Sequence, residues 1–328
     1  MVNIKDVAKY ADVSVATVSR FLNQKGYISE QSKEKIEKAI EALNYRPNHI
    51  ARSLSKKQSQ LIGLIVPDIQ NPYFPQLARA IEDTALQYDY TVVLCNTDGT
   101  PEKEQLYMNR LSQNYVAGLL IATNAMDAQA YEEIPIPVVA LDRLIDSSIP
   151  TVMTDNFGGA KKGTAHLIEC GAKNLICLRG PKNVKAADER ERGFYAAIKG
   201  TICEGKTIEA GFDFNEASGI IWKALTEDPT IDGIFASSDA VAIAAVKMIQ
   251  SLNKKVPEDI QVVGFDGIDL GKMISPELTT VCQDIYQIGQ HATTMLIEQI
   301  EGKPLKNKSI VVETQLIVRG TTRKEPKL

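Results

Sequence analysis

One short run near the start of the chain has the residue types and the spacing of a helix face that contacts DNA. The residues that we expect to make these contacts are Val15, Ala16, Thr17, Ser19 and Arg20. At about 100° per residue, most of them lie on one side of a helix, whereas Val18 and Phe21 lie on the other. Arg20 can donate to guanine O6 and N7, the small apolar side chains can contact thymine methyl groups, and the hydroxyls suit phosphate oxygens. An ordinary amphipathic helix in a small bundle shows the same pattern, so the surrounding elements decide the interpretation.

A second group of residues, farther along the chain, has the chemistry to hold a neutral polyol. Polar side chains directly follow four short apolar runs, at Asp68, Asp142 with Arg143, Ser238 and Asp266. Carboxylates accept hydrogen bonds from vicinal hydroxyls, and an arginine donates to them. Because open parallel sheets bind ligands beyond the carboxyl ends of their strands, we expect these side chains to converge between two lobes.

Three short helices are needed to present the DNA-contacting run. Asn3 begins a capping-box pattern that predicts a helix over 4–11. Ser14 is the predicted N-cap of a second helix that ends near residue 23, and a third helix is expected over about 29–43. Two short helices joined by a tight turn are typical of a helix-turn-helix module, whose second helix lies in the major groove.

The distribution of charge supports this interpretation. Residues 1–57 contain 11 Lys and Arg against 6 Asp and Glu, a net charge of +5, and the rest of the chain contains 26 against 35, a net charge of −9. An acidic chain repels a polyanion as a whole, so only its N-terminal head can carry the electrostatic attraction to nucleic acid.

No motif in the chain points to an enzyme, a metal site or a cofactor. The glycine-rich run 158–163 lacks the spacing of a dinucleotide fingerprint or a phosphate-binding loop. The five cysteines are scattered, as buried thiols usually are. The N-terminus has no signal-peptide pattern, which argues against a secreted sugar-transport protein, and no run reaches 18 apolar residues. We therefore expect a cytoplasmic protein that does not contact a membrane.

From residue 61 onward, short apolar runs alternate with helical segments. Eight of these runs are predicted strands: Leu61–Val66, Thr91–Cys95, Ala117–Ala122, Val138–Leu141, Thr151–Met153, Leu175–Leu178, Gly233–Ala236 and Gln261–Gly264. Because they are apolar throughout, they indicate parallel strands that are buried on both faces. The predicted fold class is α/β, with two doubly wound parallel-sheet lobes. We expect the first lobe over about 60–158 with 284–318, the second over about 159–283 with 319–328, and a last strand over Ile310–Val318.

Four strings of the sequence resemble the lactose/galactose repressor family of bacterial transcription regulators. They are Ile4–Ala8, Val13–Arg20, Leu43–Asn48 and Ala51–Leu54. The resemblance covers essentially the whole chain. It implies a lambda-repressor-like helix-turn-helix domain at 1–46, a hinge helix and linker at 47–59, and an effector-binding and dimerisation domain of the periplasmic-binding-protein type at 60–328.

The resemblance also implies further DNA contacts in the hinge helix. These residues are Asn48, Ala51, Arg52 and Leu54. In the family the hinge leucine wedges between two central base pairs of the minor groove, at an unstacking cost of about a few kcal/mol. The alternative is that Leu54 packs against the domain below. An isolated helix of this length is marginal in water, which suits a switch.

For the large domain, the resemblance implies effector contacts by Tyr73, Phe74, Arg190, Phe214, Asp266 and Gln283. Asp142 and Ser238, which follow predicted strands, complete the expected set. Three of these residues have an alternative role. In the alternative, Arg190 forms a surface ion pair with Asp188 or Glu189, Asp266 caps the following helix, and Phe214 belongs to the core. Trp222 is predicted to be a core residue and not a ligand platform.

The resemblance predicts a homodimer that binds a pseudo-palindromic operator under the control of a small sugar. The string from Asn71 to Arg79, together with Asp142-Arg143, is similar to the ribose-responsive branch of the family, so ribose is the first expectation. The alternative is a catabolite control regulator whose corepressor is a serine-phosphorylated phosphocarrier protein. No heptads follow Arg319, so we expect a dimer and not a tetramer.

Overall fold

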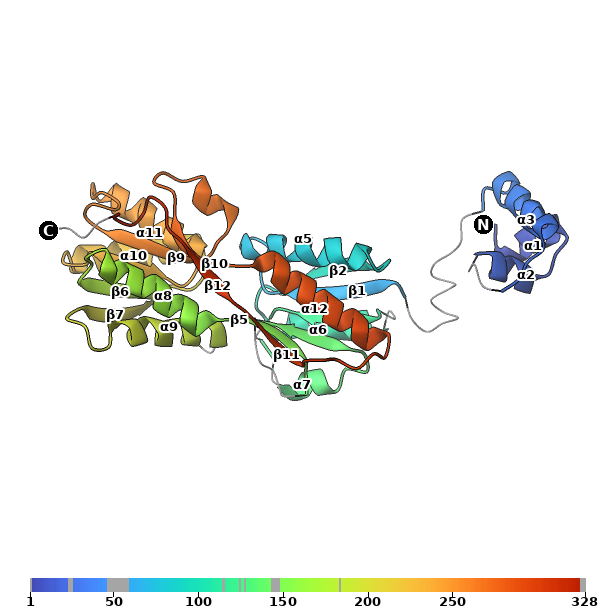
Figure 1. Ribbon diagram of the computed structural model, residues 1–328, viewed down its shortest axis with the longest axis horizontal. Helices are drawn as coiled ribbons and strands as arrows, with labels where there is room; N and C mark the ends of the chain where they lie inside the picture. The colour runs from blue at the N-terminus through green and yellow to red at the C-terminus, as the bar shows by residue number, and fades with distance from the viewer. Residues whose placement is uncertain are drawn as a thin grey trace. The chain divides into compact units, whose positions relative to one another are not determined.

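The computed structural model describes residues 2–22, 26–45, 59–113, 116–123, 125–126, 128–142, 148–182 and 184–324. The chain divides into two compact units, Met1–Ser59 and Gln60–Leu328 (Figure 1). In the described ranges, no helix is both long and apolar enough to span a bilayer.

In the described part of the first unit, residues 2–22 and 26–45, there are three helices, α1 (Ile4–Ala11), α2 (Val15–Leu22) and α3 (Glu30–Ala42). The capping box predicted at Asn3 is present, and Asp12 ends α1 in the left-handed conformation at φ 51°. At the start of α2, Ser14 Oγ accepts from the Thr17 amide over 3.1 Å. A small core of apolar side chains, including the fully buried Val18 and Ile36, holds the three helices together. The helix-turn-helix prediction is confirmed.

The first lobe of the second unit is built on a six-stranded parallel sheet with the order β11-β5-β4-β3-β1-β2. Its strands are β1 (Leu61–Val66), β2 (Thr91–Asn96), β3 (Gly118–Ile121), β4 (Val138–Leu141), β5 (Thr151–Thr154) and β11 (Ser309–Val312). Its helices are α5 (Tyr73–Leu86), α6 (Pro101–Gln113), α7 (Ala128–Glu132) and α12 (Ile285–Ile300).

The second lobe has a six-stranded sheet with the order β12-β10-β9-β8-β6-β7, in which only β12 is antiparallel. Its strands are β6 (Asn174–Arg179), β7 (Glu204–Glu209), β8 (Gly233–Ala236), β9 (Gln261–Asp266), β10 (Thr279–Gln283) and β12 (Thr314–Ile317). Its helices are α8 (Asn156–Glu169), α9 (Lys185–Ile198), α10 (Phe214–Glu227), α11 (Asp239–Ser251) and the 3-10 turn η1 (Asp269–Lys272).

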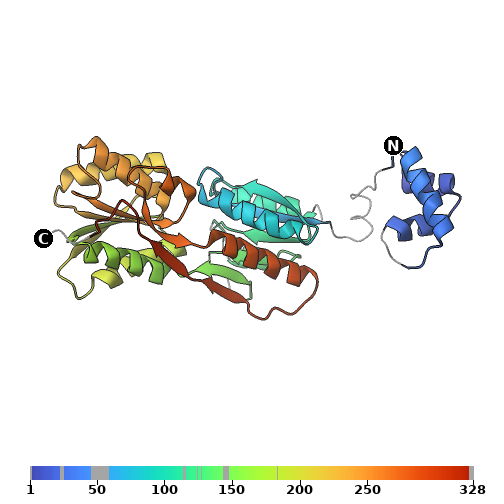
Figure 2. The same cartoon turned by 45° about the horizontal axis from the view of Figure 1, so that its top comes forward.

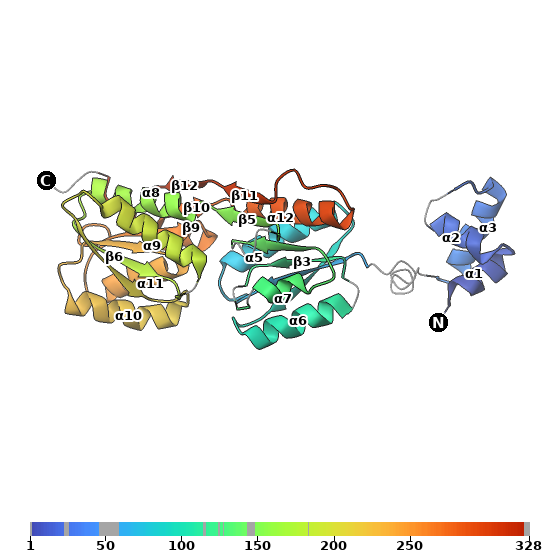
Figure 3. The same ribbon diagram turned by 90° about the horizontal axis from the view of Figure 1, so that it is seen from below.

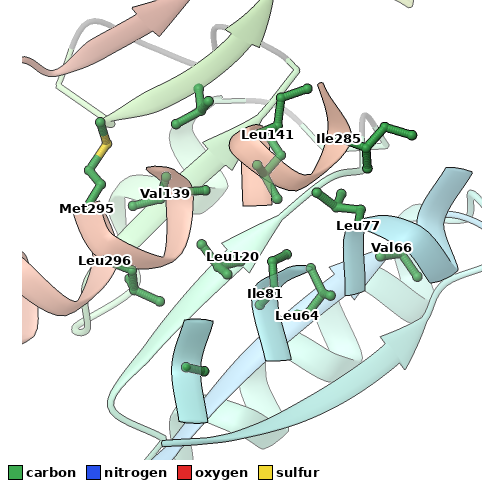
Figure 4. Packing of buried hydrophobic residues seen from close by; sticks show 14 of the residues in the cluster. Leu64, Val66, Leu77, Ile81, Leu120, Val139, Leu141, Ile285, Met295 and Leu296 are labelled. Carbon is green, nitrogen blue, oxygen red and sulfur yellow. The ribbon is translucent and has the colours of Figure 1, made fainter. Parts of the chain in front are cut away.

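Helices cover both faces of each sheet, which explains why the strands are apolar throughout. In β1, Leu64 and Val66 pack against α5 and α12, as Figure 4 shows, whereas Ile65 faces the opposite layer with α6 and α7. In the second lobe, Leu178 faces the α10 and α11 layer and Cys177 the α8 and α9 layer. Figure 3 shows these layers on either side of the strands. Alternate side chains of one strand therefore enter two different cores.

The chain crosses between the lobes at three neighbouring places (Figure 2). The crossings follow β5, β10 and β11, at residues 154–156, 283–285 and 312–314. Thr154 is paired with Val312 on one sheet and Gln283 with Thr314 on the other, so the three segments lie side by side. This bundle of crossings places the ends of β5 and β10 at the junction of the lobes.

All eight predicted strands occur, but the structure corrects the C-terminal part of the prediction. The run Ile310–Val318 is not one strand: β11 completes the first sheet, and β12 pairs with β10 in the second. The segment 284–318 therefore leaves the first lobe after Val312. Two strands were not predicted, β10 and the edge strand β7, whose sequence Glu204–Glu209 is polar because it is partly exposed.

Candidate functional site

On α2, the side chains predicted to contact DNA are separated from those that pack. Val15, Ala16 and Arg20 are exposed and Thr17 and Ser19 are partly exposed, whereas Val18 is fully buried. The Thr17 hydroxyl also lies 2.8 Å from Ser14 Oγ, so it supports the helix start. The other predicted contacts, Asn48, Ala51, Arg52 and Leu54, lie outside the described residues and stay predictions.

A cavity of about 780 Å³ lies between the two lobes of the second unit. Its lining includes all eight side chains predicted to contact an effector: Tyr73, Phe74, Asp142, Arg190, Phe214, Ser238, Asp266 and Gln283. They come from α5, the end of β4, α9, α10, the start of α11 and the ends of β9 and β10. Four of the lining residues, Asp68, Asp142, Ser238 and Asp266, were predicted from the strand ends alone, although they are up to 198 positions apart in the sequence. Arg143 lies outside the described residues.

Neutral oxygens and an aromatic ring hold the guanidinium of Arg190 in place. Its side chain is 5% exposed. Its Nε donates to Asn156 Oδ1 over 2.7 Å, and Nη1 donates to the Ser237 carbonyl over 2.6 Å. The guanidinium carbon lies 3.8 Å from the centre of the Phe265 ring. These contacts fix the plane of a group that would otherwise have several rotatable bonds.

Two carboxylates offset the buried charge of Arg190. Nη2 lies 3.7 Å from Asp142 Oδ2, and Nη1 lies 3.5 Å from Asp266 Oδ1. A buried cation needs such partners, since leaving it alone is strongly unfavourable. The predicted alternative, a surface ion pair with Asp188 or Glu189, does not occur, because each of those carboxylates pairs with a different arginine.

Hydrogen bonds at the crossings connect the two carboxylates. Gln283 Nε2 donates to Asp266 Oδ1 over 2.7 Å, and Gln283 Oε1 accepts from the Thr154 hydroxyl over 2.6 Å. Asp142 Oδ1 accepts from the Thr154 amide over 3.2 Å and from Asn156 Nδ2 over 3.1 Å. Asp266 does not cap a helix, because the residue at the N-cap of η1 is Ile268.

Burial changes the ionisation of the polar groups around the cavity. It raises the pKa of Asp266 to about 7, although Arg190 opposes the shift. Burial also raises the pKa of Asp142, again against the effect of Arg190. The hydroxyl of Tyr73 is buried, and burial raises its pKa well above the usual value, so it stays protonated. The site is thus made of carboxylates and hydroxyls that can bind hydroxyl groups.

Aromatic rings form the apolar part of the lining. Tyr73 and Phe74 meet edge to face with ring centres 5.2 Å apart at the start of α5. Phe214 packs partly on the second-lobe core and also lines the cavity, so its two predicted roles coincide. Phe212 lines the cavity as well and was not predicted. Trp222 is 50% exposed on α10, so the prediction that it belongs to the core was wrong.

Asn156 and Thr154 were also missed by the sequence interpretation. Thr154 is the last residue of β5 and Asn156 follows two positions later as the first residue of α8, close to the kind of position that identified Asp142 and Asp266. Their side chains bind other site residues and were invisible to a search for charged groups. Ser238, which was predicted, caps α11: its Oγ accepts from the Val241 amide over 3.3 Å while the residue lines the cavity. Among the described residues, no three His, Cys, Asp or Glu side chains lie close enough to hold a metal ion.

Comparisons with known families match both units. Residues 3–48 match the model described as bacterial regulatory proteins of the lacI family, and residues 59–319 match periplasmic binding proteins and the sugar-binding domain of that family. The chain belongs to the LacI family of bacterial regulators. It is 49% identical to the ribose operon repressor of Halalkalibacterium halodurans over 98% of each chain.

Two solved structures of LacI-family proteins show the same fold. The lac repressor dimer bound to operator and an anti-inducer is 27% identical and covers 98% of this chain and 99% of its own, with a TM-score of 0.86. A regulator from Enterococcus faecium with bound ribose is 27% identical and covers 82% of this chain and 100% of its own, with a TM-score of 0.74. This LacI-family chain is accordingly a sugar-responsive, DNA-binding transcriptional repressor.

Proposed function

We propose that the chain represses a ribose-utilisation operon and that ribose, bound in the cavity between the lobes, is its inducer. The observation that carries this proposal is the convergence of Asp142, Arg190, Asp266 and Gln283 on one cavity with aromatic walls. Carboxylates that accept from neighbouring hydroxyls, an arginine that donates, and rings that cover the apolar faces are what a small sugar needs. The 49% identical relative is named a ribose operon repressor, which supports the choice of sugar.

In this proposal the eight lining residues predicted from the sequence are the effector contacts. Asp142 comes from the first lobe, and Arg190 and Asp266 come from the second. A sugar bound to residues of both lobes favours one arrangement of the lobes over another, since its contacts exist together only in that arrangement. A differential affinity of this kind is the source of the allosteric effect.

The DNA-reading surface is proposed to be Val15, Ala16, Thr17, Ser19 and Arg20, with the hinge residues Asn48, Ala51, Arg52 and Leu54. Two copies would bind the two halves of a pseudo-palindromic operator, because one helix-turn-helix makes few base contacts and two-fold protein symmetry matches two-fold DNA. Since bacterial DNA lies in the cytoplasm, we place the protein there.

Other functions have less support. The relatives are repressors and not enzymes, and no catalytic chemistry is proposed for the cavity. The second candidate from the sequence, a catabolite regulator with a serine-phosphorylated phosphocarrier protein as corepressor, is tested by the same experiment as ribose. A neutral sugar fits the cavity better than a sugar phosphate does, because its lining holds the carboxylates of Asp68, Asp142, Asp213 and Asp266 against Lys182 and Arg190.

Titration calorimetry of the purified dimer tests the proposal. Ribose, arabinose, ribose 5-phosphate and a serine-phosphorylated phosphocarrier protein are compared, and ribose is expected to bind most tightly. Arg190→Ala is expected to weaken ribose binding by about 100-fold, since charge-assisted hydrogen bonds are lost. The matched control is Arg192→Ala on the same helix, whose side chain is 66% exposed and pairs with Glu189. Tighter binding of the phosphocarrier protein, with no heat from any sugar, would establish the alternative.

A further inference from the structure

We propose that Asn156 is a positioning residue that holds the Arg190 guanidinium and the Asp142 carboxylate in fixed relation across the two lobes. The inference rests on the proposed function, because its consequence is measured as sugar affinity. Asn156 does not line the cavity. It lies behind the lining, is 7% exposed, and contacts residues that do line it.

The contacts of Asn156 use both ends of its amide. Oδ1 accepts from Arg190 Nε over 2.7 Å. Nδ2 donates to Asp142 Oδ1 over 3.1 Å and to the Thr154 carbonyl over 3.2 Å. Because a guanidinium only donates and a carboxylate only accepts, the two partners fix the orientation of the amide. One side chain thereby satisfies a cation and an anion at once.

Asn156 lies where the chain crosses from the first lobe to the second, so its hydrogen bonds connect the two lobes. It is the first residue of α8 and follows directly on the crossing from β5, with Asp155 as the N-cap. Asp142 belongs to the first lobe and Arg190 to the second, and these two groups are 3.7 Å apart at their nearest atoms, beyond ordinary hydrogen-bond distance. The amide therefore supplies the direct hydrogen bonds that link the two sugar-binding groups through the crossing.

Among side chains of this size, only a protonated aspartic acid could also accept from Arg190 and donate to Asp142, and this provides the test. An ionised aspartate at position 156 has no donor and would face the carboxylate of Asp142. The two hydrogen bonds that Asn156 Nδ2 donates, to Asp142 and to the Thr154 carbonyl, would therefore be lost. A protonated aspartic acid has a carbonyl oxygen that accepts from Arg190 and a hydroxyl that donates to Asp142. Lowering the pH should therefore restore the function of the Asn156→Asp variant.

Ribose binding by calorimetry between pH 5 and pH 8 tests the bridge. We expect Asn156→Ala to weaken binding by about 10- to 100-fold at every pH, as loss of hydrogen bonds to charged groups predicts. Asn156→Asp should show a similar loss at pH 8 and much less at pH 5. Asp142 and Arg190 face the substituted group directly, Asp266 lies 3.5 Å from Arg190, and Asp239 interacts with Asp266. Asp266 and Asp239 also titrate, since burial raises their pKa values to about 7 and about 6. The quantity compared is consequently the ratio of variant to wild-type Kd at each pH. Asn109→Asp on the exposed side of α6 makes the same charge change and should leave the ratio at one.

A second measurement does not depend on the sugar. The Arg190 Nε–H signal in proton–nitrogen NMR should be protected from exchange with water in the wild type and in Asn109→Asp, and lost in Asn156→Ala. Protection together with absent ribose binding would contradict the proposed sugar but support the bridge. Equal, pH-independent affinity of both Asn156 variants, or an Nε–H signal that persists in Asn156→Ala, would overturn the inference.

Discussion

The proposed DNA-reading helix and the proposed effector cavity place their candidate functional side chains in opposite environments. On α2, Arg20 and Val15 are exposed, and a different residue, Val18, makes the core contact. In the cavity, Arg190 and Asp266 are 4% and 5% exposed, and the side chains proposed to bind sugar are themselves part of the packed interior. Function and stability are therefore carried by separate residues in the head and by shared residues in the large unit.

This difference teaches how each region should respond to substitution. Changes on the exposed face of α2 should alter DNA recognition and leave the melting temperature unchanged. Changes at the cavity should alter sugar affinity and the stability of the large unit together. Four measurements, in order of decreasing expected effect, test this difference between the two regions.

The largest effect is expected for Asp266→Asn. The substitution removes the anionic partner of Arg190 and replaces one carboxylate oxygen by an NH2 donor, which leaves a single acceptor oxygen for Arg190 and Gln283, so ribose affinity should fall by about 10- to 150-fold. Binding of the variant to operator DNA in the absence of sugar should be retained. Asp269→Asn, on the exposed turn η1 nearby, is the matched control and should bind ribose as the wild type does. Calorimetry and DNA-binding assays give the two readouts, and unchanged ribose binding would place the effector elsewhere.

Arg20→Ala should reduce discrimination between the operator and unrelated DNA by about 5- to 150-fold, which corresponds to about 1–3 kcal/mol for a bidentate base contact. Because Arg20 is exposed, the thermal unfolding of the variant should match that of the wild type. The control Lys38→Ala, on the exposed side of α3, should change binding to both DNAs alike. An intact ratio of specific to non-specific affinity would show that α2 is not the reading helix.

The stability of the unliganded large unit should depend on pH through Asp266 and Asp239. Burial raises the pKa values of these carboxyl groups to about 7 and about 6, against a usual value of 3.8. The folded state then holds protons that the unfolded chain has released, so the free energy of unfolding falls as pH rises from about 4 to about 7. Thermal unfolding should show this slope for the wild type and a smaller slope for Asp266→Asn. Parallel curves for the two proteins would contradict the assigned pKa shift.

The smallest effect is expected for Tyr73→Phe. The Tyr73 hydroxyl is buried, and among the described residues it has no hydrogen-bond partner. A buried polar group without a partner costs about 1–3 kcal/mol, so removing it should raise the melting temperature of the unliganded protein by a few degrees. A lower melting temperature would show that the hydroxyl is bonded in solution. Phe74→Leu, which changes the adjacent ring and leaves the hydroxyl in place, is the control.

The head was predictable from its sequence almost to the residue, because helical periodicity and capping are local. The pattern at Asn3, the turn at Asp12 and the cap at Ser14 each depend on neighbours a few positions away. In the large unit, runs that are apolar throughout revealed the parallel strands, and residues at strand ends revealed the cavity. The effector set as a whole depended on family resemblance.

What the sequence concealed depends on contacts between distant segments. Asn156 has no charge, and its role follows only from its place between Asp142 and Arg190. The separation of β11 from β12 at Glu313 is decided by which sheet has an open edge for each strand. Trp222, predicted to be a core residue, lies on the outer side of α10 and is half exposed.

The central claim is that sugar in the cavity controls DNA binding by the head. The direct test is the affinity of the dimer for duplexes that it selects from a random pool, measured by fluorescence anisotropy with and without saturating ribose, for the wild type and for Arg190→Ala. Ribose should weaken wild-type binding by about 5- to 150-fold, the usual range of allosteric coupling, and should leave Arg190→Ala unchanged. Wild-type affinity that does not respond to ribose, or an equal response in Arg190→Ala, would contradict the account.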